Sequence, residues 1–218
     1  MMARGPQSFT KITQIHRHLE DCAKEAGIVT KFVYVEDIGI DAQQRFTDLD
    51  DQVITWMFKL YPWEFMFQED YAEHLGAQDI RWIEPPWKAI LSNKALMPML
   101  WKLFPDHPNL LPAFFEDELD TVPEGMLLVK KPIFSREGAN ISFTDSNGQP
   151  IDGDGATDGA YGEEGYIYQQ RHLLPTFDEN HTLIGSWLID DQPAGISLRE
   201  DSTAITQDMS RYLPHVIV

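Results

Sequence analysis

The sequence predicts an α+β fold with two lobes, in which mainly antiparallel sheets are flanked by helices. Two observations carry this prediction: helical and mixed patterns occupy the first half of the chain, and short strand-like runs separated by turn residues occupy the second. A length of 218 residues suits one domain or two small ones and is enough to bury a sizeable core. The hydrophobic content of 43% is ordinary for a globular protein, so general disorder is not expected.

In the first half of the chain, apolar residues at near-helical spacing predict a long helix, and Gly27 supplies its end. Aromatic residues with a high strand preference follow, and Pro62 suits the first turn of a further helix. Residues 37–51 are polar and rich in turn formers. The elements predicted here are a helix over 8–26, strands over 28–36 and 53–60, and a helix over 63–75.

The second half opens with a helix after Pro85-Pro86 and continues as a series of short strands. The helix is predicted over 87–104, and its expected buried face consists of Trp87, Ile90, Leu91, Leu100, Trp101 and Phe104. The predicted strands cover residues 126–131, 139–144, 165–170, 183–189 and 195–198. Asn147-Gly148 lies between extended runs, which is a good signal for a β-hairpin turn.

The net charge argues against a nucleic-acid partner. Seventeen lysines and arginines stand against 35 acidic residues, so the formal net charge is −18. Residues 137–218 hold fourteen acidic and three basic residues, a net of −11. A chain this acidic repels phosphate backbones, and its basic residues do not cluster, so no nucleic-acid partner is expected.

Membrane insertion and disulfide bonding are not expected either. No apolar run reaches the roughly 18 residues that a spanning helix needs, and no apolar segment behind Met1 resembles a signal peptide. We therefore expect a cytoplasmic protein without a membrane partner. The single cysteine, Cys22, excludes an internal disulfide, and its place on the predicted first helix favours a buried, unreactive thiol.

An acidic, glycine-rich stretch from Asp152 to Gly159 is a candidate for metal binding. It resembles a calcium loop, with Glu163 as its twelfth position. However, Ala156 and Thr157 stand where such a loop needs an oxygen ligand and a glycine. A surface hairpin loop is therefore favoured over a calcium site, and the seven histidines show no paired metal spacing.

Two adjacent lysines lie at the end of an apolar run. Because neighbouring side chains on a strand point to opposite faces, either Lys130 or Lys131 faces the interior or a cleft while the other faces solvent. A lysine in a cleft favours an anion, commonly phosphate. Two solvated lysines at a strand end are the alternative. Lys94 lies on a predicted helix whose other face is apolar, where a solvated lysine is again the alternative.

Three further segments have patterns that suit nucleotide chemistry, each with an ordinary structural alternative. Gly138 lets the backbone approach a ligand and Arg136 pairs readily with phosphate oxygens, although a hairpin turn with an ion pair has the same pattern. The strand over 164–170 would offer an adenine the backbone donors and acceptors of a strand edge, although a plain core strand is favoured without other evidence. Arg199, beside two acidic residues, belongs either to a surface ion pair or to a metal–phosphate site.

Taken in order, several motifs resemble the glutathionylspermidine synthase family. The resemblance runs from about residue 14 to the end and is strongest to the stand-alone members that lack an amidase domain. The shared order makes the resemblance specific. The motifs are 59–64 (KLYPWE), 83–88 (IEPPWK), 92–95 (SNKA), 105–112 (PDHPNLLP), 131–140 (KPIFSREGAN), 166–169 (YIYQ) and 197–201 (SLRED).

The resemblance implies an ATP-grasp-like ligase, with a partial substrate-side lobe over 1–84 and a nucleotide-binding region over 85–218. In such a carboxylate–amine ligase, ATP phosphorylates the glycine carboxylate of glutathione, and an amine of spermidine attacks the acyl phosphate. The implied cofactors are ATP and Mg²⁺, because magnesium neutralises the triphosphate during transfer. The implied partners are a glutathione- or peptide-like carboxylate donor and a polyamine-like amine acceptor.

The resemblance also implies roles for individual residues. Arg136 and Arg199 are the implied catalytic residues. The implied nucleotide-binding residues are Lys94 and Lys131 at the phosphates, Glu137 and Gly138 in the loop over them, Gln169, Gln170, Arg171 and His172 at adenine, and Ala204, Ile205 and Thr206 closing the pocket. The implied substrate-side residues are Lys59, Trp63 and Glu64, with a core position as the alternative for Trp63.

The family's synthetase unit is considerably longer than this chain, which resembles its C-terminal part. The preceding segment of the family carries the magnesium ligands, so the metal ligands are not identified from this sequence. Two other interpretations stay open. One is a non-catalytic remnant that keeps the fold and binds nucleotide or polyamine, and the other is an acidic module that binds cationic partners by charge.

Overall fold

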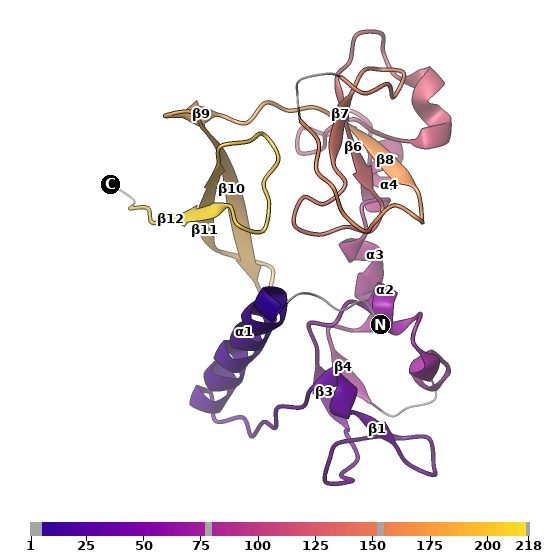
Figure 1. Ribbon diagram of the computed structural model, residues 1–218, viewed down its shortest axis with the longest axis vertical. Helices are drawn as coiled ribbons and strands as arrows, with labels where there is room; N and C mark the ends of the chain where they lie inside the picture. The colour runs from indigo at the N-terminus through magenta and orange to yellow at the C-terminus, as the bar shows by residue number, and fades with distance from the viewer. Residues whose placement is uncertain (1–5, 77–79, 152–154, 217–218) are drawn as a thin grey trace. The chain divides into compact units, whose positions relative to one another are not determined.

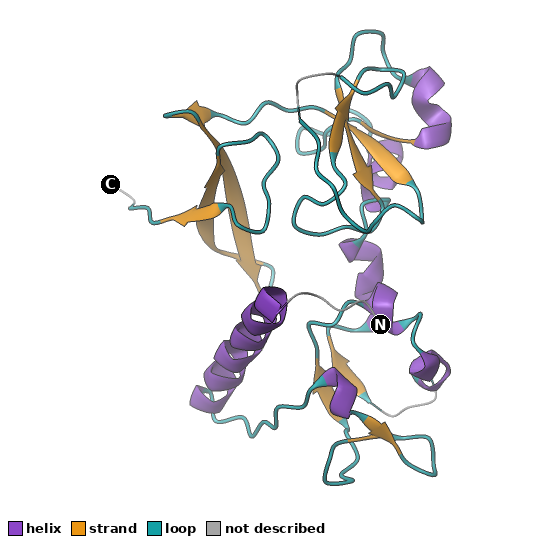
Figure 2. Ribbon diagram, in the orientation of Figure 1, coloured by secondary structure: helices purple, strands orange, loops and turns teal. Residues whose placement is uncertain are grey.

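The computed structural model describes residues 6–76, 80–151 and 155–216, with the side chains of the first helix described from residue 15 onward. The chain divides into two compact units, Met1–Ala89 and Ile90–Val218 (Figure 1). Helices occur together with largely antiparallel sheets, which confirms the predicted α+β class (Figure 2). No described helix is long and apolar enough to cross a membrane. The functional assignment of residues 1–84 and 85–218 stays a prediction.

The first unit contains one long helix and several short elements. In order these are α1 (Pro6–Glu25), η1 (Val35–Asp37), β1 (Gly39–Ile40), β2 (Phe46–Thr47), β3 (Trp56–Phe58), α2 (Trp63–Met66), η2 (Asp70–His74), β4 (Arg81–Ile83) and η3 (Pro86–Lys88). β1 pairs with β2 in antiparallel fashion, and β3 pairs with β4 in parallel. The predicted helix over 8–26 is confirmed as α1, and the strand predicted over 53–60 is present as the shorter β3.

The helix predicted over 63–75 is broken into α2 and the 3-10 helix η2. The amides of Gln68 and Glu69 donate to carbonyls only three residues back, at 3.0 and 3.4 Å. Such tightened bonds are typical of a helix terminus. The apolar spacing that suggested one continuous helix therefore spans two short ones.

The strand predicted over 28–36 is wrong, because this segment is irregular up to η1. The guanidinium carbon of Arg17 lies 3.8 Å above the Phe32 ring, and the Phe32 and Tyr34 rings meet edge to face at 4.9 Å. Strand preference reflects packing against neighbouring strands, and no described strand pairs with this segment. Its aromatic side chains pack on α1 and on each other instead.

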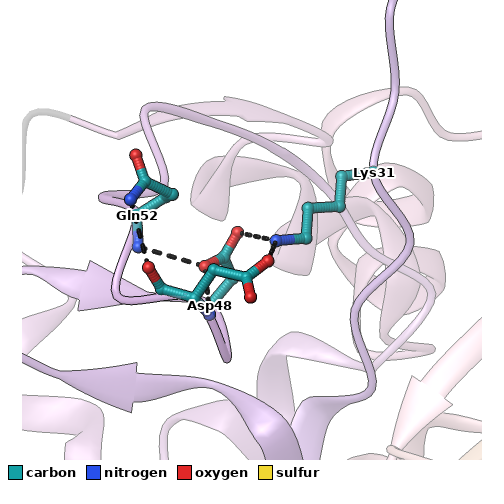
Figure 3. Close-up of polar contacts among 4 residues, drawn as sticks. Lys31, Asp48 and Gln52 are labelled. Carbon is teal, nitrogen blue, oxygen red and sulfur yellow. Dashed lines mark hydrogen bonds and ion pairs between the residues drawn. The ribbon is translucent and has the colours of Figure 1, made fainter.

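A polar cluster holds this irregular segment to the loop after β2 (Figure 3). The ammonium of Lys31 donates to Asp48 at 2.6 Å and to Asp50 at 2.5 Å. The buried Asp48 carboxylate also accepts the backbone amides of Asp50 and Gln52, at 2.9 and 3.0 Å. The hydrogen bond from Lys31 lowers the pKa of Asp48 below its usual value, and the same contact raises the pKa of Lys31.

The predicted burial of Cys22 is also wrong, because its side chain is exposed. Its sulfur lies 3.8 Å from the Nε2 atom of His18, one turn earlier on α1. One face of a helix packs on the rest of the protein and the other faces solvent. Cys22 lies on the solvent-facing side of α1, which depends on packing that the local sequence does not encode.

Among its described residues, the second unit contains two antiparallel sheets of four strands, ordered β5-β8-β6-β7 and β12-β11-β10-β9. Its elements are α3 (Ala89–Ser92), which begins at the boundary, α4 (Leu96–Leu103), β5 (Ala113–Phe115), η4 (Glu116–Thr121), β6 (Leu128–Pro132), β7 (Ser142–Thr144), β8 (Tyr166–Gln170), β9 (Thr176–Phe177), β10 (Asn180–Ile189), β11 (Gln192–Asp201) and β12 (Arg211–Leu213). All five predicted strands are present within a few residues, while β5, β9 and β12 were not predicted. The Asn147-Gly148 turn is confirmed, since Thr144 bridges to Pro150 across it.

The helix predicted over 87–104 is interrupted between α3 and α4. The amide of Lys94 donates to the carbonyl of Ile133 at 2.9 Å instead of continuing the helix. The expected buried face is therefore wrong in part: Leu100 and Trp101 are half-buried, whereas Trp87, Ile90, Leu91 and Phe104 are exposed. Pro98 is fully buried and occupies the first turn of α4, where proline is tolerated.

Asp48→Asn is expected to reduce the loss of stability of the first unit at acid pH. A carboxylate with a lowered folded-state pKa stabilises the fold above its unfolded pKa, near 3.9, and loses that contribution as the pH falls through the folded value. Urea unfolding between about pH 2.5 and 7 measures this change. Asp51→Asn, an exposed carboxylate in the same loop, is the matched control. If the free energy of unfolding fell equally steeply at acid pH in both variants, the stabilising role of the Asp48 carboxylate would be contradicted.

Candidate functional site

The pairing of β6 with β8 positions the first candidate residues. In this register Lys130 lies opposite Tyr168 and Lys131 lies opposite Ile167, so the two lysines lie on opposite faces of the sheet. The ammonium of Lys130 lies 4.2 Å from the ring centroid of Tyr166, within cation–π distance. The predicted division of the two lysines between the faces is confirmed, although Lys130 is half-buried on a tyrosine rather than solvated.

Lys131 is half-buried, and its ammonium is hydrogen-bonded within the sheet. Its ammonium donates to the Oε1 atom of Gln169 at 2.8 Å, and its strand neighbour Ile167 is fully buried. Burial lowers the pKa of Lys131 below its usual value, because an ammonium in apolar surroundings loses solvation. An anion placed beside this ammonium would replace the lost solvation.

Lys94 lies close to the segment that follows β6. Its backbone amide donates to the carbonyl of Ile133, and its ammonium donates to the carbonyl and the hydroxyl oxygen of Ser135 at 2.8 and 2.7 Å. Ser135 is buried. Lys94 is thus attached to the stretch of backbone 131–135, whose first residue, Lys131, lies 37 positions later in the sequence.

The loop after this stretch carries Arg136, Glu137 and Gly138. The amide of Ala139 donates to the carbonyl of Arg136 at 3.0 Å and closes a tight turn. Glu137 and Gly138 both have positive φ, 56° and 73°. The hydroxyl of Thr157 donates to the carbonyl of Gly138 and holds the turn from its other side.

Gly138 brings this loop against residues 204–206. A Cβ atom at Gly138 would lie 2.3 Å from the carbonyl oxygen of Thr206 and 3.2 Å from the side chain of Ile205. Ile205 is itself buried. Two segments that the sequence assigned separately to the phosphate loop and to the closure of the pocket are therefore in contact, and only glycine fits at the point of contact.

Arg199 and Asp201 hold the loop that carries residues 204–206. The Nη2 atom of Arg199 donates to the carbonyl of Gln207 at 2.6 Å. The Asp201 carboxylate accepts the amide and the hydroxyl of Thr203, both at 2.8 Å, and the hydroxyl of Ser210. Burial disfavours the ionised carboxylate, but these hydrogen bonds outweigh it and lower the pKa of Asp201. Sequence reasoning gave no role to Ser135, although it lies in the motif 131–140, or to Ser210, because neither side chain carries a charge.

The residues predicted at adenine lie at the end of β8, and this strand has the internal position that was the favoured alternative. β8 lies between β5 and β6, and it is not an edge strand. The amide of Gln170 donates to the carbonyl of Pro112 at 2.7 Å, and that of Arg171 donates to Leu127 at 2.8 Å. His172 follows the strand and is exposed. These backbone donors are already used, so the contacts of an adenine with residues 169–172 stay a prediction.

The substrate-side residues belong to the first unit. Trp63 is 4% exposed, and its indole donates to the carbonyl of Glu84 at 3.1 Å. Glu64 is buried as well. The ammonium of Lys59 lies 3.9 Å above the Trp63 ring, and Lys59 lines an otherwise largely apolar cavity of about 50 Å³. Trp63 therefore has the core position that was its alternative, and Lys59 is the residue of the three that lines this cavity.

The described residues do not include a group of three histidine, cysteine, aspartate or glutamate side chains that could hold a metal ion. Residues 152–154 of the predicted calcium-like loop lie outside the described part of the chain. Ala156, at the missing ligand position, instead forms a bridge with Ser142, as expected of a hairpin loop.

Comparisons with known proteins agree with the motifs. A family model described as glutathionylspermidine synthase preATP-grasp matches residues 12–218. The "Putative acid--amine ligase" of Haemophilus influenzae is 42% identical over 204 residues, which is 92% of this chain and 52% of the relative. The trypanothione synthetase of Crithidia fasciculata is 39% identical over 130 residues, covering 59% of this chain and 19% of the relative.

A more distant relative matches over most of the chain. The bifunctional glutathionylspermidine synthetase/amidase of Escherichia coli is 26% identical over 224 residues, covering 92% of this chain and 35% of the relative. The chain thus spans about half, or less, of the length of the curated relatives it matches.

Gly138→Ala is expected to destabilise the second unit by more than the roughly 1 kcal/mol that alanine costs at a positive φ, because its Cβ would also meet the carbonyl of Thr206. Gly125→Ala is the matched control, since Gly125 has a φ of 80° and open space around it. Thermal unfolding of the two variants measures the difference. Equal losses of stability would show that the contact between residues 138 and 206 is not formed.

Proposed function

Because the chain belongs to the glutathionylspermidine synthase preATP-grasp family, we propose that it is the nucleotide-binding part of an ATP-dependent carboxylate–amine ligase. The observation that carries the proposal is that Lys94 is hydrogen-bonded to the stretch of backbone that begins with Lys131 and leads directly into the loop of Arg136 to Gly138. Cations at the end of a strand, next to a glycine turn, suit a polyphosphate.

The proposed reaction has two steps. A carboxylate oxygen of the donor attacks the γ-phosphorus of ATP, the bond to the β-phosphate oxygen breaks, and ADP leaves. The neutral amine of the acceptor then attacks the acyl carbon, phosphate leaves with the electron pair of its C–O bond, and the nitrogen releases a proton to water. In this scheme Lys94 and Lys131 bind the phosphates, and Arg136 and Arg199 stabilise the charge of the transferring group.

Glu137, Gly138 and residues 204–206 cover the nucleotide in this proposal. Their contact in the structure supports this role, because the Gly138 backbone and the Thr206 carbonyl already meet. ATP fits the cations of the site. Magnesium, which neutralises a triphosphate when bound, has no group of three suitable side chains among the described residues, so we assign no step to it.

We propose a glutathione- or peptide-like carboxylate as the donor and a polyamine-like amine as the acceptor. The names of the relatives support this choice, since they include a glutathionylspermidine synthetase/amidase, a trypanothione synthetase and an acid–amine ligase. The formal net charge of −18 favours a polycationic acceptor. Lys59, at a cavity of the first unit, is the candidate contact on the substrate side.

The second candidate function is nucleotide binding without turnover. The observation that favours it is the length of the chain, which matches 52% of the acid–amine ligase relative and 35% of the synthetase/amidase. ADP release with glutathione and spermidine separates the two. Turnover by this chain alone excludes the non-catalytic alternative, and binding of ATP without ADP release favours it.

Lys131→Met is expected to weaken the binding of Mg-ATP by tenfold or more, which is about 1.4 kcal/mol, because it removes a charge-assisted contact. Isothermal titration calorimetry measures the change. Lys130→Met is the matched control, since Lys130 is the neighbour on the opposite face and lies on Tyr166. Absence of nucleotide binding by the unchanged chain, or equal losses in both variants, would contradict the proposal.

A further inference from the structure

The side chain of Ser135 is polar and buried, 8% exposed, and it directly precedes Arg136. Its hydroxyl accepts a hydrogen bond from the ammonium of Lys94 at 2.7 Å, and its carbonyl accepts one from the same ammonium at 2.8 Å. Because a lysine ammonium is a donor only, the hydroxyl oxygen must be the acceptor in this contact. Ser135 therefore fixes the ammonium of Lys94 in two directions.

The backbone around Ser135 is itself held in place. The amide of Ile133 donates to the carbonyl of Gly165 at 3.0 Å, directly before β8, and the carbonyl of Ile133 accepts the amide of Lys94 at 2.9 Å. The stretch 133–135 thus joins the start of β8 to both ends of Lys94, its backbone amide and its ammonium. Contacts at both ends restrict a long side chain that is otherwise flexible.

This restriction matters for the binding of an anion by Lys94. A flexible lysine loses rotamer freedom when it binds an anion, and that loss weakens binding. A side chain that is already held in its bound position loses less. The hydroxyl of Ser135 suits this purpose because it is uncharged: a carboxylate at the same place would attract the ammonium but repel a phosphate.

We propose that Ser135 is a positioning residue, whose hydroxyl holds the ammonium of Lys94 ready for the phosphates of ATP and so strengthens nucleotide binding. This inference rests on the proposed function, because it requires Lys94 to bind the phosphates. Ser135 acts through Lys94 and needs no contact of its own with the nucleotide. Its contribution to nucleotide binding must therefore disappear when the ammonium of Lys94 is removed.

The first test is a double-mutant cycle on the full 218-residue chain, with Mg-ATP binding measured by isothermal titration calorimetry. Ser135→Ala is expected to weaken binding about fivefold, because one hydrogen bond to the ammonium is lost. Lys94→Met is expected to weaken it about tenfold or more. The double variant should bind within about twofold of Lys94→Met, because the two residues act as one unit.

Thr144→Val is the matched control for Ser135→Ala. It also removes one buried hydroxyl from the second unit, but the Thr144 hydroxyl has no hydrogen-bond partner among the described residues. Its effect on Mg-ATP binding should stay below about twofold, because no contact with the ammonium of Lys94 is lost.

The second test needs no nucleotide. NMR of labelled lysine side chains follows the exchange of the ammonium hydrogens with water. In the unchanged chain this exchange should be about tenfold slower at Lys94 than at Lys24, whose side chain is 53% exposed, because Ser135 accepts hydrogen bonds from the Lys94 ammonium. Ser135→Ala should accelerate it about threefold or more at Lys94, and Thr144→Val should not.

The proposal is overturned by unchanged Mg-ATP binding in Ser135→Ala, by losses that add up in the double variant, or by equal effects of Ser135→Ala and Thr144→Val. Exchange at Lys94 as fast as at Lys24 in the unchanged chain would also overturn it. If the unchanged chain does not bind Mg-ATP, the proposed function fails, and the exchange measurement still decides whether Ser135 positions Lys94. If circular dichroism shows that Ser135→Ala is unfolded, exchange in the unchanged chain decides.

Discussion

The antiparallel register of β6 and β8 is the constraint on which the candidate site depends. It opposes Lys131 to the fully buried Ile167 and brings its ammonium to Gln169, while Lys130 lies on a tyrosine ring across the sheet. A slip by one residue would exchange the two faces and place the wrong lysine at the site. The interior packing of Leu128 and Tyr168, both buried, opposes such a slip. The contacts that stabilise the sheet thus also position the ammonium of Lys131.

Loops place the other candidate residues of the site. Lys94 attaches the break between α3 and α4 to the backbone after β6, and the Gly138 turn touches the carbonyl of Thr206. Arg199 and Asp201 hold the loop of Thr206 through main-chain and hydroxyl groups. Arg199 is therefore held by a carbonyl through one nitrogen of its guanidinium, and its part in phosphoryl transfer stays a proposal.

Local periodicity predicted the features that depend on near neighbours. These include α1, the Asn147-Gly148 turn and the division of Lys130 and Lys131 between opposite faces, because each rests on a helical, turn or strand repeat. The failures depend on distant partners. The helix over 87–104 is interrupted where Lys94 bonds to Ile133, and the aromatic run over 28–36 packs on α1 instead of a strand. The contact of Gly138 with Thr206 is likewise invisible to any local pattern.

The most direct measurement of the central claim is the pKa of Lys131 with and without Mg-ATP, followed by NMR of labelled lysine side chains and assigned with Lys131→Met. Burial lowers the pKa of Lys131 in the free chain. A phosphate beside the ammonium favours its charged form, so the account predicts that ATP raises the pKa of Lys131. A pKa of Lys131 that stays the same at saturating ATP would contradict the placement of the nucleotide at this site.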